Sequence, residues 1–207
     1  MGIAGMDKKG KGGTIKKKIL MKEIIKIVAI GPESTGKSTL CQQLATHYQS
    51  IWCPEYAREY LEKNVAGYTY DDLLTISRGQ IELEESATSG LLFKKEAHLP
   101  GQGSKPLFVD TDMYVMKVWC EYAFEKCHSW ILNQIATRNY DLFLLCNVDL
   151  PWIQDNLREY PDKKTRIKLY NYYKDSMINQ SVPWVEISGG FQQRIGKAIQ
   201  AVDNLMQ

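Results

Sequence analysis

A glycine-rich loop between two segments of regular pattern limits the possible fold of this chain more than any other part of the sequence. Residues 27–30 are apolar and mostly β-branched, which predicts a buried strand. Residues 31–38, G-P-E-S-T-G-K-S, match the pattern G-x-x-x-x-G-K-[ST] without a gap, and a helical pattern opens at Thr39. This order of strand, loop and helix predicts a phosphate-binding loop in an α/β fold, and hence a nucleoside triphosphate site.

The residue types in the loop suit a polyphosphate. Gly31 and Gly36 permit a turn in which backbone N–H groups point inward and nothing blocks the approach of the ligand. The positive end of the following helix faces the β-phosphate, the Lys37 ammonium spans β- and γ-phosphate oxygens, and the Ser38 hydroxyl ligates Mg²⁺. We therefore expect ATP and Mg²⁺ as ligands. The predicted ATP-binding residues are Gly31, Pro32, Glu33, Ser34, Thr35, Gly36, Lys37, Ser38 and Thr39.

Composition predicts one ordinary globular domain. The chain has 207 residues, of which 44% are hydrophobic, enough for a full core. Its longest apolar runs have strand length and the N-terminus lacks a secretory signal, so we expect a cytoplasmic protein with no membrane partner. The five cysteines are scattered and mostly lie in apolar segments, which favours reduced core thiols. The spacing of Cys120, Cys127 and His128 matches no zinc pattern.

The first 22 residues differ from the rest in charge and complexity. They hold seven of the 26 basic residues and one acidic residue, which leaves 19 basic and 23 acidic residues in the remainder. Such a Gly/Lys-rich segment buries too little apolar surface to fold, so we predict a disordered tail at 1–22 and a single domain at 23–207, with Met21 as an alternative start. A nucleic-acid-binding arm is the rival interpretation. No aromatic residue interleaves with the lysines, so we expect no nucleic-acid partner.

Strand-like apolar runs alternate with longer helical patterns along the domain. This alternation predicts βαβ units, and therefore a three-layer α/β sandwich with a five-stranded parallel sheet and helices on both faces. Residues 98–106 are a turn-rich link. The predicted strands are 24–30, 50–53, 107–109, 142–147 and 184–188. The predicted helices are at about 37–48, 57–65, 70–97, 111–127, 130–138, 153–159, 165–180 and 191–205.

A second motif is an apolar run that ends in a carboxylate, L-F-V-D at residues 107–110. It is typical of a Walker B strand. Ligands in open α/β sheets gather at the carboxyl ends of strands, so Asp110 is expected to face the loop and hold Mg²⁺ directly or through water. Asp112 follows closely and has two interpretations, a substrate contact or a helix cap.

The third motif, P-E-Y-A-R-E-Y at residues 54–60, follows the second predicted strand. Glu55 could lie near an acceptor hydroxyl and Arg58 near a phosphate or carbonyl. The alternative is an exposed amphipathic helix with charge pairs three and four residues apart.

The fourth motif, P-W-I-Q-D-N-L-R at residues 151–158, starts a polar stretch that predicts a lid of short helices at about 151–166. Arg158 is the candidate for closing over a γ-phosphate, and a solvated charge run is the alternative. Tyr114, Trp119 and Tyr122 follow the second motif at near-helical spacing. Core packing is their default role, and stacking on a heterocyclic substrate is the alternative, with a cation–π contribution if that ring is positively charged.

Together, G-P-E-S-T-G-K-S-T, P-E-Y-A-R-E-Y, V-D-T-D and P-W-x-x-D-x-L-R resemble the ribosylnicotinamide kinase domain of NadR-type proteins of NAD biosynthesis, from about Lys26 to the C-terminus. The resemblance implies a P-loop nucleoside/nucleotide-kinase-like fold. It also implies ATP-dependent phosphorylation of the 5′-hydroxyl of nicotinamide riboside, a small-molecule substrate. In that architecture we expect the second strand to lie next to the phosphate-loop strand, so that Glu55 faces the γ-phosphate from the acceptor side.

The resemblance also implies residue roles. Lys37, Glu55, Asp110 and Arg158 would be catalytic; Ser38 and Asp110 would hold Mg²⁺; Glu55, Tyr56, Arg58 and Asp112 would bind the substrate. Two departures stand out. The adenylyltransferase domain that usually precedes this kinase has no counterpart in the chain, so we expect no adenylyl transfer, and Asp155-Asn156 replaces an expected Asp-Gly. A kinase for another nucleoside or small metabolite, and a non-catalytic nucleotide-sensing module, remain alternatives.

Overall fold

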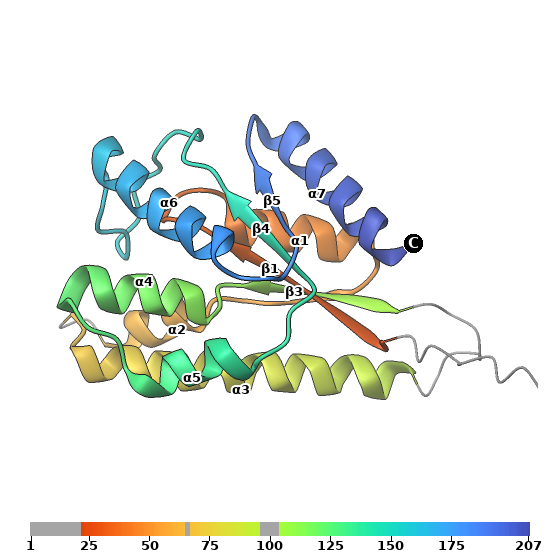
Figure 1. Ribbon diagram of the computed structural model, residues 1–207, viewed down its shortest axis with the longest axis horizontal. Coiled ribbons are helices and arrows are strands. Elements are labelled where there is room, and N and C mark those ends of the chain that lie inside the picture. Colours follow the sequence, from red (N-terminus) through yellow and green to blue (C-terminus); the bar gives the residue numbers. More distant parts are fainter. Residues whose placement is uncertain (1–21, 65–66, 96–103) are drawn as a thin grey trace, which may run out of the picture.

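The computed structural model describes residues 22–64, 67–95 and 104–207 (Figure 1). The predicted tail, apart from its last residue, and most of the turn-rich link lie outside these residues. Lys22 belongs to the ordered domain, because its ammonium forms an ion pair of 2.7 Å with Asp141.

The described strands form one parallel sheet in the order β2-β3-β1-β4-β5. All five predicted strands are present, with ends that differ from the prediction by two residues or fewer. They are β1 (Ile24–Ile30), β2 (Ile51–Cys53), β3 (Lys105–Asp110), β4 (Leu142–Cys146) and β5 (Trp184–Ile187). The parallel sheet brings the carboxyl ends of all these strands to one edge, where ligands of α/β proteins bind.

The expected position of the second strand was wrong, because β3 and not β2 lies beside β1. The two strands differ in burial: β3 is buried at five of its six positions, whereas β2 has three residues of which only Cys53 is buried. A continuous buried run needs neighbours on both edges, and a short half-buried strand suits the edge of the sheet.

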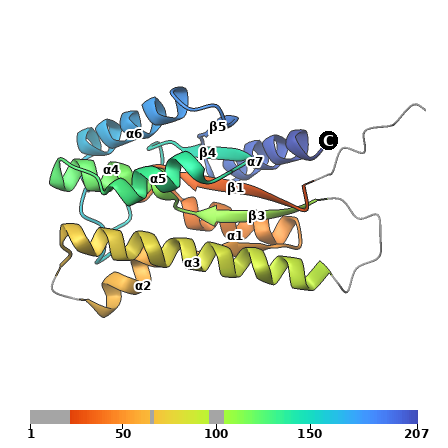
Figure 2. The same cartoon turned by 60° about the horizontal axis from the view of Figure 1, so that its bottom comes forward.

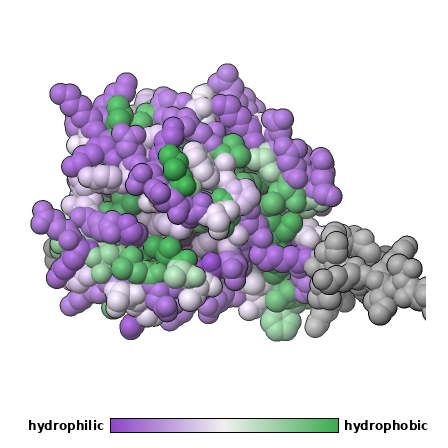
Figure 3. Space-filling view, in the orientation of Figure 1, coloured by the Kyte–Doolittle hydropathy of each residue, from purple (hydrophilic) through white to green (hydrophobic). Residues whose placement is uncertain are grey.

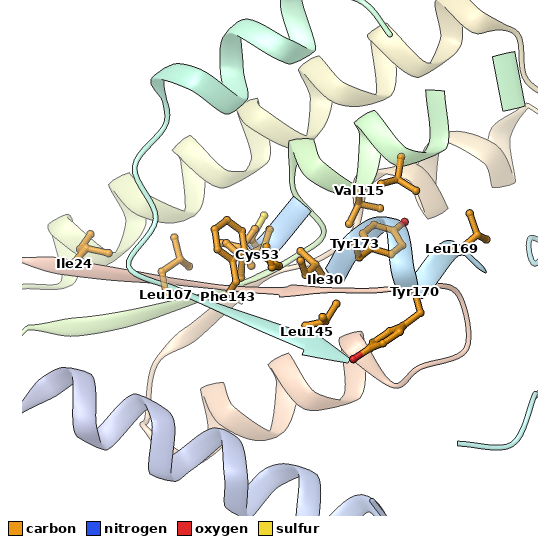
Figure 4. Close-up of a cluster of buried hydrophobic side chains, with 14 of the residues drawn as sticks. Ile24, Ile30, Cys53, Leu107, Val115, Phe143, Leu145, Leu169, Tyr170 and Tyr173 are labelled. Carbon is orange, nitrogen blue, oxygen red and sulfur yellow. The ribbon is translucent and has the colours of Figure 1, made fainter. Parts of the chain in front are cut away.

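Helices cover both faces of the sheet, as the alternating pattern predicts (Figures 1 and 2). One face packs against α1 and α7, and the other against α3, α4 and α6. Figure 4 shows part of the second interface, where Val115 and Tyr173 meet the strand residues Ile30 and Leu145. The helices of the described residues are α1 (Lys37–His47), α2 (Tyr56–Lys63), α3 (Tyr70–Lys95), α4 (Met113–Phe124), α5 (Ser129–Thr137), α6 (Lys163–Ile178) and α7 (Phe191–Met206).

The predicted helix at 153–159 is absent, and this part of the lid prediction is wrong. The segment between Pro151 and Pro161, called here the proline-bounded segment, has no regular structure beyond one turn. A side-chain oxygen of Asp155 accepts from the backbone N–H of Leu157 at 3.0 Å, a local bond that competes with a helix. The following helix, α6, starts two residues earlier than predicted because Asp162 caps it.

The face of the molecule that Figure 3 shows is mostly hydrophilic, with hydrophobic side chains gathered in separate patches. No helix among the described residues combines the length and the apolarity that crossing a membrane requires.

Candidate functional site

The phosphate loop has the backbone geometry that its glycines predict. Gly31 has φ of +137°, and a Cβ atom there would lie 2.7 Å from the carbonyl oxygen of Cys146 on β4. Only glycine fits both constraints, so the loop can pass close to the neighbouring strand. Gly36 is the N-cap of α1, which directs the positive end of that helix into the loop.

The side chains of the loop lie around this helix end. The Lys37 ammonium donates to the carbonyl oxygens of Gly31 at 3.1 Å and Pro32 at 3.0 Å. The buried Thr35 hydroxyl donates to the same Pro32 oxygen at 2.7 Å. These bonds hold the Lys37 cation beside the N-terminus of α1, an arrangement that suits a bound polyphosphate.

A buried arginine from the last helix supports the loop from behind. Arg194 is 4% exposed and donates to the carbonyl oxygens of Thr35 at 3.0 Å and Asn147 at 2.8 Å. It also forms an ion pair with Asp149. Sequence reasoning missed Arg194, because it lies far along the chain from the loop and belongs to no local motif.

Asp110 ends β3 as a buried carboxylate of 1% exposure. Neither of its oxygens has a hydrogen-bond partner of regular geometry among the described residues. Burial and then the charge of Glu55 raise the pKa of Asp110 to about 6, while Lys37 and the Ser38 hydroxyl act in the opposite direction. A buried unpaired carboxylate beside a hydroxyl fits a hard divalent cation.

The described residues contain no group of three or more His, Cys, Asp or Glu side chains that could hold a metal ion. Any divalent cation held by Ser38 and Asp110 would therefore take its other ligands from phosphate and water, as Mg²⁺ does in kinases.

Glu55 follows β2 at the N-cap position of α2. Its carboxylate accepts from the Thr111 hydroxyl at 3.3 Å. Thr111 has φ of +76°, a conformation that strains a β-branched residue. Gln80 of α3 donates to the carbonyl oxygens of Pro54 at 3.3 Å and Asp110 at 3.4 Å, so it ties the ends of β2 and β3 together. Sequence reasoning assigned no role to Thr111 or Gln80.

Two predicted substrate-binding residues, Asp112 and Tyr56, do not line the cavity over the phosphate loop, which is called here the main cavity. Asp112 is the N-cap of α4 and accepts from the N–H of Tyr114 at 3.0 Å, in agreement with the capping interpretation, and burial raises its pKa to about 7. Tyr56 packs against Gly79 of α3, where a Cβ atom would lie 2.1 Å from its ring.

The main cavity, of about 210 Å³, lies over the phosphate loop. It is lined by residues 32–39, by Glu55 and Arg58, and by Arg158 from the proline-bounded segment. The structure therefore brings together the loop, the third motif and the fourth motif, and it places Asp110 beside them.

A second cavity of about 660 Å³ adjoins the first and shares its residues Arg58, Leu61, Trp119 and Leu157. Trp119 Nε1 donates to the Tyr68 hydroxyl at 2.7 Å, and that hydroxyl donates to Glu159 at 2.9 Å. The carboxylates that line this cavity are Glu62, Asp155 and Glu159. Of the three aromatic residues predicted on α4, Trp119 and Tyr122 line the main cavity, whereas Tyr114 packs edge-on against Phe143 of the sheet.

Comparisons with known proteins agree with this geometry. The trifunctional NAD biosynthesis/regulator protein NadR of Escherichia coli (strain K12) is 24% identical over 185 residues, which cover 87% of this chain and 42% of that protein. NadR of Salmonella typhimurium gives the same values. The chain therefore spans less than half the length of these curated relatives.

Solved structures share the fold. A crystal structure of NadR protein in complex with NR matches with a TM-score of 0.66 and 23% identity, covering 89% of this chain and 50% of that one. Thymidylate kinase from Ehrlichia chaffeensis matches with a TM-score of 0.59 and 15% identity, covering 90% and 100%. The predicted P-loop kinase fold is confirmed.

A family model described as an AAA domain matches residues 26–194, which include the phosphate loop, Asp110 and Arg194. Because this match covers most of the chain, the protein belongs to that AAA-domain family of P-loop proteins.

Proposed function

We propose that the protein transfers the γ-phosphoryl group of ATP to the 5′-hydroxyl of nicotinamide riboside, giving nicotinamide mononucleotide and ADP. One observation carries this proposal. A phosphate loop lines one cavity, an aromatic and acidic pocket forms the next, and the two share Arg58, Leu61, Trp119 and Leu157. A phosphoryl donor in the first cavity and an acceptor hydroxyl in the second can therefore meet at the boundary between the two cavities. The similarity to NadR, of which structures with NR and with NAD and AMP-PNP are known, supports this choice of ligands.

The loop side of the boundary suits the donor. The N-terminus of α1 and the Lys37 ammonium would bind the β- and γ-phosphates, exchanging the carbonyl oxygens that Lys37 now contacts for phosphate oxygens. Ser38 and Asp110 would hold Mg²⁺, which would neutralise charge on the phosphate oxygens. Burial of Asp110 keeps bulk water away from that position.

The other side of the boundary suits the acceptor. Glu55 lines the main cavity, and its carboxylate can accept the proton of a hydroxyl held within hydrogen-bond distance. The Thr111 hydroxyl donates to this carboxylate and holds it near the end of β3. Arg158 would stabilise negative charge on the transferring group, and the proline-bounded segment, which makes up most of the predicted 151–166 lid, would exclude water.

The second cavity favours a positively charged ring. Trp119 and Tyr68 offer aromatic faces and edges, and the three lining carboxylates outnumber the single arginine. Nicotinamide riboside carries a cationic pyridinium ring, whereas the common nucleosides are neutral. Cation–π attraction and the surplus of carboxylates therefore favour it over them.

Mass-spectrometric detection of the phosphorylated product, from purified protein with Mg-ATP and nicotinamide riboside, tests the proposal. A panel with uridine, adenosine, thymidine and the neutral reduced form of nicotinamide riboside separates the alternatives. We expect the highest kcat/KM for the cationic form. A higher kcat/KM for a neutral nucleoside would give the protein another substrate, and ATP binding without turnover on any acceptor would make it a nucleotide-sensing module.

A further inference from the structure

Two side chains of the phosphate loop contact the proline-bounded segment. Glu33 Oε2 accepts from the backbone N–H groups of Glu159 at 2.9 Å and Tyr160 at 3.4 Å. Ser34 Oγ accepts from the backbone N–H of Ile153 at 3.0 Å. The loop therefore holds the segment near both of its ends, through bonds that do not depend on the side chains of the segment.

Arg166 of α6 adds a third connection. Its guanidinium is 4% exposed, donates to the carbonyl oxygen of Ser34 at 3.2 Å, and lies 5.4 Å from the centre of the Trp152 ring. Burial lowers the pKa of this arginine, and the charge of Glu33 acts in the opposite direction. Burial likewise raises the pKa of Glu33 above its usual value, while the backbone N–H groups of Tyr160 and Glu159 favour its carboxylate form.

Arg158 lies between these connections. Its guanidinium donates to the carbonyl oxygen of Ile153, and its side chain lines the main cavity. Because the segment contains no helix, no ladder of internal hydrogen bonds fixes the position of Arg158. On the side that faces α2 the segment is also held by an ion pair of 3.1 Å between Asp155 and Arg58, and by the Tyr68 hydroxyl, which donates to the Glu159 side chain at 2.9 Å. The ion pair is partly exposed, and such pairs contribute little.

We propose that Glu33 is a positioning residue, whose carboxylate holds the backbone of the proline-bounded segment so that Arg158 stays over the phosphate loop. The role rests on the proposed phosphoryl transfer and assigns Glu33 to the segment rather than to ATP. Loop and segment then act as one unit, and a nucleotide bound by the loop finds the arginine already in place.

Steady-state kinetics of three variants test this role. Glu33→Ala should lower kcat by about 10²-fold with little change in the KM for ATP, because a misplaced catalytic group costs turnover more than binding. Glu33→Gln should keep most of the activity, since its amide oxygen can accept from the same two N–H groups. Glu82→Ala, which removes an exposed glutamate on α3, is the matched control and should behave as the wild type.

Hydrogen exchange without any nucleotide tests the contact itself. The amides of Glu159 and Tyr160 should exchange faster in Glu33→Ala than in the wild type, and at the wild-type rate in Glu82→Ala. This measurement needs no substrate. If the wild type phosphorylates no acceptor, the proposed function fails while the exchange rates still decide whether Glu33 holds the segment.

Unchanged exchange at these two amides in Glu33→Ala would overturn the proposal. Faster exchange with undiminished kcat would overturn it as well, because the contact would then not position Arg158. Equal losses in Glu33→Ala and Glu33→Gln, with normal exchange in Glu33→Gln, would show that Glu33 acts on the nucleotide by its charge.

Discussion

Asp110 and Asp112 are two residues apart but lie in different environments. Both oxygens of Asp110 lack regular hydrogen-bond partners among the described residues, whereas one oxygen of Asp112 caps α4. Thr111, which has a positive φ, lies between them and donates to Glu55. We therefore expect Asp110 and Glu55 to contact ligands and Asp112 to act mainly as a helix cap.

Neutralising Glu55 and Asp112 in turn should separate these roles. Glu55→Gln keeps the size of the side chain but removes the basic charge, so kcat for nicotinamide riboside should fall by roughly 10² to 10⁴ with nearly unchanged ATP affinity. Asp112→Asn keeps an oxygen that can cap α4, so kcat and both KM values should stay near wild type. Steady-state kinetics measure both variants. An inactive Asp112→Asn with an active Glu55→Gln would require the two assignments to be exchanged.

The long helix α3 joins the layers that carry the site. Over 26 residues it contacts α2 through Gly79, the ends of β2 and β3 through Gln80, and β1 through Glu84. These three positions are one to five residues apart. A local change in α3 should therefore shift the backbone that Gln80 contacts, at Asp110 and at Pro54 next to Glu55.

Alanine substitutions at two glycines of α3 should have opposite effects on stability. Gly79→Ala places a Cβ atom 2.1 Å from the Tyr56 ring, so the ring or α2 must move, and overpacking of this kind costs about 1–3 kcal/mol. Gly90→Ala meets no atom within 4 Å and should stabilise the protein by about 0.5–1 kcal/mol through helix propensity. Urea denaturation measures the free energy of unfolding of both variants. A stabilised Gly79→Ala variant would show that Tyr56 yields without cost.

Glu84 makes stability depend on pH. It is 1% exposed and pairs with Lys26 at 2.6 Å and Arg138 at 2.9 Å. Burial opposes ionisation, but these partners lower the pKa of Glu84 below its usual 4.5. A lowered folded-state pKa gives stability that is present above about pH 4.5 and is lost as the pH falls through the folded-state value.

Glu84→Gln should therefore cost about 3 kcal/mol at pH 7, because it leaves two partly buried cations without their buried carboxylate. The difference in the free energy of unfolding between this variant and the wild type should become smaller below about pH 4.5. Urea denaturation at about pH 7, 5 and 4 measures it. Glu85→Gln is the matched control. It loses one partly exposed contact of 3.2 Å to Arg138 and should cost less than about 1 kcal/mol. A difference that widens on acidification would contradict this account.

Local sequence patterns predicted most of the strands and helices, but not which of them lie side by side in the folded protein. The apolar run of β3 and the glycine loop before α1 are visible in sequence, because burial and turn chemistry act within a few residues. The order of β2 and β3 depends on which strand is better buried, a property of the whole sheet. The absent helix at 153–159 was mispredicted because the contacts of Asp155 and Glu33 with the backbone outweigh the helical pattern.

The site joins segments from the full length of the domain. The phosphate loop near the start is supported by Arg194 near the end, and Glu33 of that loop holds the proline-bounded segment. The catalytic candidates in the four motifs could be found from sequence, because each lies in a recognisable local pattern. Arg194 and Gln80 could not, since their roles follow from distances that only the folded chain sets.

This connectivity predicts that binding of nucleotide stabilises the whole domain. At a concentration of Mg-ATP about 100 times the Kd, a ligand that binds only the folded state adds about 2.7 kcal/mol, or roughly 5–10 °C in Tm for a domain of this size. Lys37→Ala should lose most of this shift and all phosphoryl transfer, because the ammonium neutralises phosphate charge.

Without nucleotide, Lys37→Ala should melt near the wild-type Tm. Among the described residues, the Lys37 ammonium bonds to two loop carbonyl oxygens and lies in none of the core clusters. Lys63→Ala is the matched control. Lys63 is an exposed lysine paired with Glu59 on α2, and its replacement should leave the nucleotide-induced shift intact. Thermal melting of the three proteins with and without Mg-ATP gives the result. A full shift in Lys37→Ala would mean that the nucleotide binds elsewhere than in the loop of residues 31–38.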